Sequence, residues 1–275
     1  MDKDVKDIFD FFKTTIYTDN TPDEIVWQKS QQAVKDMLAE QHYTQVKRLY
    51  RFAGQSGSGK TTQLLPTITK LEELRGNKPF VLAVRNFAKY HPQFNELLAT
   101  FGKSEIRKQT DGFALKCLSA AYKQLMEKGI LMIDEMGTSD PEFESYKTKI
   151  IQDNDYTTEY HIMAVNQKLS NLFIEKREKD TTSPEGGRAA WKEMQDRRYN
   201  ILPTGIDHLG KIDTKSQCFV WTAYDKKPIY QGKLNGATQA IETGRKLFKQ
   251  STHSEETLRN AKLQHLLSLE NTMDK

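Results

Sequence analysis

The stretch FAGQSGSGKTTQ, residues 52–63, constrains this chain more than any other. Between Gly54 and Thr61 it completes the pattern G-x-x-x-x-G-K-[ST]. Glycines let successive backbone N–H groups turn toward phosphate oxygens, and a helix that starts at the loop adds its positive dipole end. The apolar run 49–53 and the helical pattern 61–74 supply the flanking strand and helix. The sequence therefore predicts a nucleoside-triphosphate site.

Each residue type in this P-loop has a chemical task. We expect Lys60 to reach the β- and γ-phosphates and the Thr61 hydroxyl to bind Mg²⁺, so the expected cofactors are ATP or GTP with Mg²⁺. The predicted nucleotide-binding residues are Gly54, Gln55, Ser56, Gly57, Ser58, Gly59, Lys60, Thr61 and Thr62. Hydrolysis, phosphoryl transfer and mechanical work all use such a site, so the loop alone does not name the reaction.

Strand and helix patterns alternate after the loop. Further strands are predicted over 80–84, 130–133 and 160–165, helices over 113–127, 142–151, 169–179 and 189–199, and a late hairpin over 218–223 and 229–231. This order predicts an α/β fold of the P-loop NTPase/kinase type, a mostly parallel central sheet with helices on both faces. Helices are added at both ends. The predicted division is an N-terminal helical extension over 1–48, a P-loop kinase-like domain over 49–234 and a C-terminal helical segment over 235–275.

Composition and charge narrow the partners. The 275 residues include 41 basic and 37 acidic ones, a formal net charge of +4 without a basic block, which disfavours nucleic acid as a partner. The N-terminus lacks the features of a signal peptide, and no run is long and apolar enough for a membrane helix. Cys117 and Cys218 lie among apolar residues, as expected of buried thiols in a reducing cytoplasm.

Several stretches together resemble the zeta toxin family of P-loop kinases. The loop is close to the family's G-Q-P-G-S-G-K-[ST], with Ser56 in place of proline. The other matching stretches are YHPQF at 90–94, GILMIDEMGTSDP at 129–141, AVNQKLS at 164–170 followed by Arg177-Glu178, GGR at 186–188, EMQDR at 193–197 and the hairpin at 219–230. Their order and approximate spacing agree with the family over 49–234.

The resemblance implies a function. Members of this family phosphorylate a hydroxyl of UDP-N-acetylglucosamine and are usually held inactive by a small antitoxin. It thus implies a small-molecule acceptor, with a nucleotide-sugar favoured, and an antitoxin partner. Two family arginines surround the γ-phosphate, and Arg177 and Arg188 match them by position. His91 and Thr138 match substrate-side positions, although a His-Pro pair equally suits the entrance of a helix.

One position departs from the family. Six residues before His91, where the family carries the Asp thought to take the proton from the sugar hydroxyl, this chain has Arg85. The base can instead be Asp134 or Glu135, which end an apolar strand as Walker B acids do, so Asp134 is also a candidate Mg²⁺ ligand. Alternatively, Arg85 binds an anionic group of a different acceptor, or the protein binds nucleotide and transfers poorly.

Three functions therefore compete. The first is a zeta-toxin-like kinase, with Lys60, Asp134, Glu135, Arg177 and Arg188 as catalytic residues. The second is a nucleotide-binding homologue without transfer activity. The third is a nucleic-acid-dependent P-loop ATPase with Asp134 and Glu135 as Walker B acids, which the short chain and balanced charge disfavour.

Overall fold

A computed structural model describes residues 1, 3–13, 19–40, 42–135, 141–179, 192–248 and 252–273, without the side chains of 104, 192–194 and 270–273. The described strands form one six-stranded sheet in the order β2-β3-β1-β4-β5-β6. The strands are β1 (Arg48–Ala53), β2 (Phe80–Leu82), β3 (Met132–Asp134), β4 (Thr157–Met163), β5 (Gln217–Trp221) and β6 (Tyr230–Lys233). All neighbouring pairs are parallel except β5 and β6, the predicted late hairpin.

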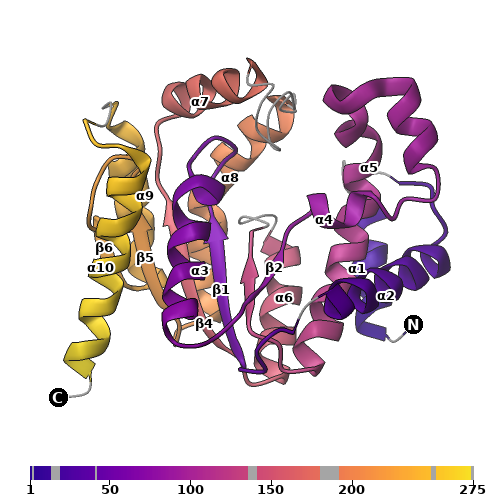
Figure 1. Ribbon diagram of the computed structural model, residues 1–275, viewed down its shortest axis with the longest axis horizontal. Helices are drawn as coiled ribbons and strands as arrows, with labels where there is room; N and C mark the ends of the chain where they lie inside the picture. Colours follow the sequence, from indigo (N-terminus) through magenta and orange to yellow (C-terminus); the bar gives the residue numbers. More distant parts are fainter. Residues whose placement is uncertain are drawn as a thin grey trace.

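Helices cover both faces of the sheet (Figure 1). One face carries α3 (Leu65–Leu74) and α10 (Glu255–Met273). The other carries α1 (Lys3–Lys13), α2 (Asp23–Glu40), α5 (Phe94–Glu127), α6 (Pro141–Asp153), α8 (Lys192–Ile212) and α9 (Ala237–Lys246). The short α4 (Arg85–Ala88) follows β2, and α7 (Gln167–Lys179) lies beyond the carboxyl ends of the strands. No helix among the described residues combines the length and apolarity needed to cross a bilayer.

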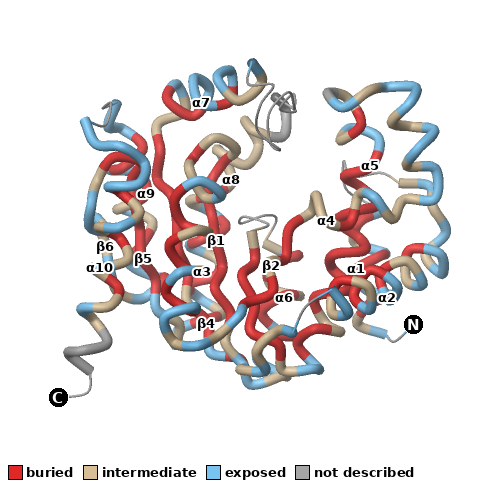
Figure 2. Tube along the Cα trace, viewed as in Figure 1, coloured by how far each residue is buried: buried red, intermediate tan, exposed pale blue. Residues whose placement is uncertain are grey.

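The alternation of side chains along β1 explains the two faces. Tyr50 and Phe52 pack against α3, whereas Leu49 packs in the cluster of α1, α2, α5 and α6, and Ala53 in that of α8 and α9. Figure 2 shows the sheet as the most deeply buried part of the chain. The strand β1 thus delivers the P-loop from the centre of the molecule.

Several predicted elements differ in extent. The strand expected over 80–84 ends at Leu82, because the chain turns into α4 at Arg85. The helix expected over 113–127 begins at Phe94 and contains a non-helical break at Gly102. The fourth strand, expected over 160–165, is Thr157–Met163. The α8 helix continues to Ile212, beyond the expected end at 199 and through Pro203.

The terminal segments share the core of the sheet. The helices α1 and α2 pack against α5 in the same apolar cluster as β1, β2 and β3, and none of their residues lines the pocket described below. The α10 helix packs along α3 through buried Leu266. The division at 48 and 234 stays a prediction.

A buried ion cluster lies between β1, β3 and α6. The guanidinium of Arg51 lies 2.5 Å from Glu144 Oε2 and 3.5 Å from Asp134 Oδ2, and its Nη1 donates to Tyr160 Oη at 3.0 Å. The Nζ of Lys147 lies 2.9 Å from Glu144 Oε1 and 3.7 Å from Asp134 Oδ2. Burial would raise the pKa of Glu144, but the charges of Arg51 and Lys147 outweigh it and lower that pKa to about 2.

Removing one member of this cluster should destabilise the fold strongly. We expect Glu144→Gln to lower the free energy of unfolding by about 3–5 kcal/mol, because it leaves Arg51 and Lys147 buried without that carboxylate. Asp153→Asn, which breaks the exposed pair with Lys149, is the control and should cost less than about 1 kcal/mol. Urea unfolding measures both.

The stability difference between the native protein and Glu144→Gln should depend on pH. The pKa of Glu144 is lowered by folding, so its contribution is complete above the ordinary carboxyl pKa and disappears as the pH falls toward 2. The stability gap between the native protein and Glu144→Gln should therefore narrow between about pH 4.5 and pH 2. A gap that stays constant over this range would contradict the assignment of the charge to Glu144.

Candidate functional site

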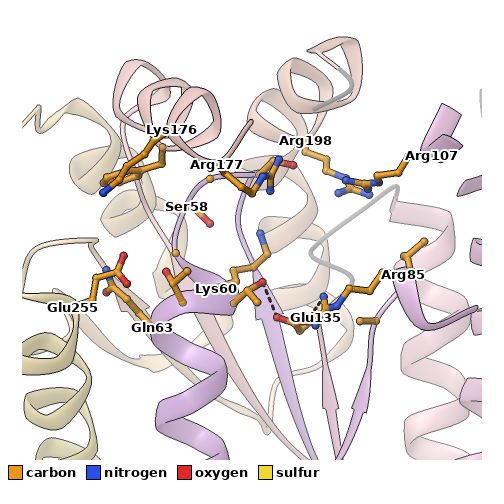
Figure 3. Close-up of a pocket in the computed structure, with 18 residues that line it drawn as sticks. Ser58, Lys60, Gln63, Arg85, Arg107, Glu135, Lys176, Arg177, Arg198 and Glu255 are labelled. Atoms are coloured by element: carbon orange, nitrogen blue, oxygen red, sulfur yellow. Dashed lines mark hydrogen bonds and ion pairs between the residues drawn. The ribbon is translucent and has the colours of Figure 1, made fainter. Parts of the chain in front are cut away.

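A pocket of about 490 Å³ opens at the carboxyl end of the sheet (Figure 3). The P-loop and the turn after it form its floor, and α5, α7, α8 and the start of α10 supply its walls. The lining residues are 56–63, 83–85, Arg107, Glu135, Phe173, Lys176, Arg177, Arg198 and Glu255. The pocket thus gathers residues from most of the chain around the predicted phosphate-binding loop.

The P-loop has the backbone that its glycines predict. Gly54, Gly57 and Gly59 all have positive φ, at 133°, 72° and 99°. At Gly57 a Cβ would lie 2.4 Å from the carbonyl oxygen of Ser170, so a side chain does not fit there. The amide of Gln55 donates to that residue's hydroxyl at 2.6 Å and to the carbonyl of Val165 at 2.7 Å. These bonds fix the loop against the start of α7.

One feature of the loop suits a phosphate ligand. The hydroxyl of Ser58 is buried, with the residue 1% exposed, and has no hydrogen-bond partner among the described residues. A phosphate oxygen would satisfy it, because buried polar groups are nearly always hydrogen-bonded.

The turn Lys60–Leu64 is a π-helix, and α3 begins after it at Leu65. The sequence predicted a helix from 61 without this irregularity.

Lys60 lines the pocket, and its surroundings disfavour the charged form of its side chain. Its Nζ donates to the carbonyls of Gly54 and Gln55 at 2.6 and 2.9 Å. Burial and the positive charges of Arg198 and Arg177 lower the pKa of Lys60 to about 7, against the opposing effect of Glu135. An anion bound beside these cations would favour the protonated ammonium, so the site is electrostatically suited to phosphates.

Glu135 joins the loop to Arg85. Its Oε1 accepts a hydrogen bond from the Thr61 hydroxyl at 3.0 Å, and its Oε2 lies 2.7 Å from Nη1 of Arg85. The Glu135 side chain is 4% exposed and lies on the floor of the pocket. The Thr61 hydroxyl and the Glu135 carboxylate place two oxygen atoms next to each other. Mg²⁺ binds oxygens of this kind alongside phosphate oxygens and waters. These residues therefore fit the predicted metal.

Asp134, which directly precedes Glu135 in the sequence, lies outside the pocket. Asp134 is 2% exposed, belongs to the buried cluster with Arg51 and Lys147, and does not line the pocket. Successive side chains of a strand point to opposite faces, which separates Asp134 from Glu135. The geometry therefore favours Glu135 over Asp134 for the predicted catalytic and metal-binding roles.

Of the remaining predicted site residues, some line the pocket, one does not, and others lie outside the described residues. Arg177 and Arg85 line the pocket. His91 does not; its ring packs edge-on against Phe113 at 4.9 Å and its Nδ1 accepts from the Gln93 amide, which favours the helix-entrance interpretation. Thr138 and Arg188 lie outside the described residues, and their roles stay predictions.

Sequence reasoning missed eight lining residues. These are Gln63, Ala83, Val84, Arg107, Phe173, Lys176, Arg198 and Glu255. Phe173 lies four residues before Arg177 on α7, so helical spacing from Arg177 could have indicated it. That spacing does not indicate Lys176, which directly precedes Arg177. Nothing local marks Arg107, Arg198 or Glu255, because only the tertiary fold brings α5, α8 and α10 to the P-loop.

The charges around Lys60 predict how its pKa responds to substitution. Arg198→Ala removes a positive charge and should raise the pKa of Lys60 by roughly 0.5–1, whereas Glu135→Gln should lower it. Arg107→Ala is the control, because Arg107 lines the pocket without being among the groups that shift Lys60. The pH dependence of the ¹³Cε lysine signals measures this. A Lys60 signal that titrates near 10.5 in every variant would contradict the account.

Comparisons with known proteins identify the family and the fold. The zeta toxin family profile matches residues 33–234. Toxin zeta of Streptococcus agalactiae is 30% identical over 166 residues, 59% of this chain and 55% of that protein. The chain thus aligns with about half the length of this curated relative.

Two solved structures share the fold. A chain of the PezAT chromosomal toxin–antitoxin system of Streptococcus pneumoniae superposes with a TM-score of 0.62 at 19% identity, covering 90% of this chain and 98% of that one. A chain of the AvrRxo1-ORF1:-ORF2 complex with ATP gives 0.51 at 10% identity, covering 88% and 84%. The predicted α/β fold of the P-loop kinase type is confirmed. Since the family profile spans most of the chain, this protein belongs to the zeta toxin family.

Proposed function

We propose that this protein is a phosphotransferase that moves the γ-phosphate of ATP or GTP to a hydroxyl of a small molecule, with a nucleotide-sugar such as UDP-N-acetylglucosamine as the favoured acceptor. The observation that carries the proposal is the meeting of Lys60, the Thr61–Glu135 pair, Arg177 and Arg198 in one pocket. Phosphoryl transfer needs cations around the γ-phosphate and a carboxylate near the nucleophile that can accept its proton, and this pocket has both.

The donor phosphates are held by the P-loop. Backbone N–H groups of the loop and the Ser58 hydroxyl would bind phosphate oxygens, and Lys60 would bind between the β- and γ-phosphates. Arg177 and Arg198 would stabilise the charge that spreads over the γ-phosphate oxygens in the transition state. Bound Mg²⁺, held by Thr61 and Glu135, would neutralise the charge that develops on the β- and γ-oxygens.

The acceptor hydroxyl would attack from the side of β2 and β3. Its oxygen forms a bond to the γ-phosphorus, the bond to the β–γ bridging oxygen breaks, and the nucleoside diphosphate leaves. The hydroxyl proton needs a base, and Glu135 is the carboxylate on this side of the pocket among the described residues. Arg85, at the family's Asp position, holds the Glu135 carboxylate in place.

An antitoxin partner is part of the proposal. PezAT is a toxin–antitoxin system, and this chain shares the fold of a PezAT chain. We infer that a small antitoxin protein regulates this kinase. The free thiols of Cys117 and Cys218 are both buried, which supports action in a reducing cytoplasm.

A second candidate is nucleotide binding without transfer. The observation that favours it is the pairing of Arg85 with Glu135, because the pair engages the carboxylate that would otherwise accept the proton. The two candidates share the donor site and differ only in chemistry.

A transfer assay separates the candidates. With γ-³²P-ATP, Mg²⁺ and UDP-N-acetylglucosamine, we expect label to move to the sugar nucleotide. Lys60→Ala should reduce the rate at least ~10²-fold, and Glu135→Gln about 10²–10⁴-fold. Glu105→Gln, an exposed carboxylate on α5 paired with Lys108, is the matched control and should keep the rate.

The outcomes are distinct. Label that moves to water alone would indicate an ATPase, and tight ATP binding with no transfer to a panel of nucleotide-sugars, dinucleotides and sugar alcohols would favour the second candidate. Full activity of Glu135→Gln would remove Glu135 from the mechanism and leave the kinase assignment standing.

A further inference from the structure

The pocket has two ends, which lie on either side of Lys60. Figure 3 shows Glu135 and Arg85 on one side of Lys60 and Glu255 on the other. In a P-loop site the lysine reaches the β- and γ-phosphates, while backbone N–H groups hold the α- and β-phosphates. Glu135 and Thr61 mark the side of the metal and the acceptor, so the γ-phosphate of a bound donor faces them. The α-phosphate and the nucleoside then extend toward Glu255.

The start of α10 is held against the turn that follows the P-loop. The Ser254 hydroxyl accepts a hydrogen bond from the Thr257 amide at 3.2 Å, as an N-cap residue does. One turn after Glu255, Nη1 of Arg259 donates to the carbonyl of Thr62 at 3.4 Å. Residues four apart share one face of a helix, so Glu255 lies on the face of α10 that meets Thr62. Both residues line the pocket at this end.

The carboxylate of Glu255 is an acceptor without a partner in the described part of the chain. Its side chain forms no hydrogen bond or ion pair there, not even with Lys176, which Figure 3 shows on the same side of Lys60. A carboxylate repels phosphates, so this end of the pocket does not suit the triphosphate. An ionised carboxylate accepts hydrogen bonds, and the two hydroxyls of ribose can donate them. Dinucleotide-binding folds hold ribose with an acidic side chain in this way.

Phe173 supplies an aromatic surface at the same end. It lies three residues before Lys176, on the same face of α7, and it lines the pocket with 41% of its surface exposed. A nucleobase stacked on this ring would cover apolar surface that is otherwise open to water. Such stacking tolerates any base, because every base has a π-face. This end of the pocket therefore fits a ribonucleoside and has no preference for one purine.

We propose that Glu255 and Phe173 form the subsite for the nucleoside of the donor, in which Glu255 accepts hydrogen bonds from the ribose hydroxyls and Phe173 stacks on the base. The subsite selects ribonucleoside over deoxyribonucleoside triphosphates and binds ATP and GTP about equally well. The inference rests on the proposed function, because it names how the donor of that reaction is chosen. Glu255 lies beyond residues 33–234, which the family profile matches, so this role comes from the fold of this chain.

Nucleotide binding without an acceptor tests the role of Glu255. Calorimetry in Mg²⁺ measures non-hydrolysable analogues of ATP, 2′-deoxy-ATP and GTP. We expect the native protein to bind the ATP analogue about ten-fold more tightly than its 2′-deoxy form and about as tightly as the GTP analogue. In Glu255→Ala the preference for the ribose form should disappear. The two forms carry the same charge, so the loss of a negative charge from the pocket does not alter this comparison.

A second variant tests the stacking. Phe173→Ala should weaken the ATP and GTP analogues alike, by about ten-fold, and leave the affinity for inorganic tripolyphosphate unchanged. The matched controls are Glu256→Ala on α10 and Leu172→Ala on α7, exposed neighbours that do not line the pocket. Both controls should bind every probe as the native protein does, and all four variants should keep the native thermal midpoint.

Four results would overturn the inference. They are an undiminished ribose preference in Glu255→Ala, native affinity of Phe173→Ala for both analogues, an equal loss of tripolyphosphate binding in Phe173→Ala, and a strong preference of the native protein for one purine. Failure of the proposed function looks different. A protein that discriminates ribose through Glu255 and never transfers phosphate would lose the kinase assignment alone.

Discussion

The buried charge of Arg51 is the constraint on which the site depends. This residue lies in the central strand β1, two positions before the strand ends, and pairs in register with Asp134 of β3. Its guanidinium needs anions in the interior, and Glu144 and Asp134 supply them, with Lys147 completing the cluster. The cluster ties β1, β3 and α6 together directly below the pocket. The P-loop after β1 and Glu135 after β3 therefore emerge side by side.

The pocket above this cluster is divided by charge. On one side the P-loop, Lys60 and Arg198 are suited to a triphosphate, and burial together with the charges of Arg198 and Arg177 lowers the pKa of Lys60. On the other side Arg85 is balanced by Glu135 and Arg107 by Asp111. Arginines already paired with carboxylates can orient an acceptor without attracting the donor's phosphates more strongly than the P-loop does.

Local patterns predicted most of the fold and only part of the site. The P-loop was readable because strand, glycines and helix are adjacent in the sequence, and the parallel sheet followed from the alternation of elements. Asp134 and Glu135 could not be told apart, because a strand end does not reveal which of two successive acids points inward. Arg198 and Arg107 carry no local signal. The amino-terminal half of α5 was missed because residues 94–112 are polar and interrupted at Gly102.

The central claim is that the cations of the pocket bind the phosphates of a nucleotide. Proton uptake on nucleotide binding tests this claim most directly. Because the pKa of Lys60 is about 7, the residue is largely neutral at pH 8, and bound phosphate should restore its proton. Calorimetry of Mg²⁺–ATP binding at pH 8, in buffers of different ionisation enthalpy, should show uptake of nearly one proton, and Lys60→Arg should show none. Binding without proton uptake, or an undiminished uptake in Lys60→Arg, would contradict the account.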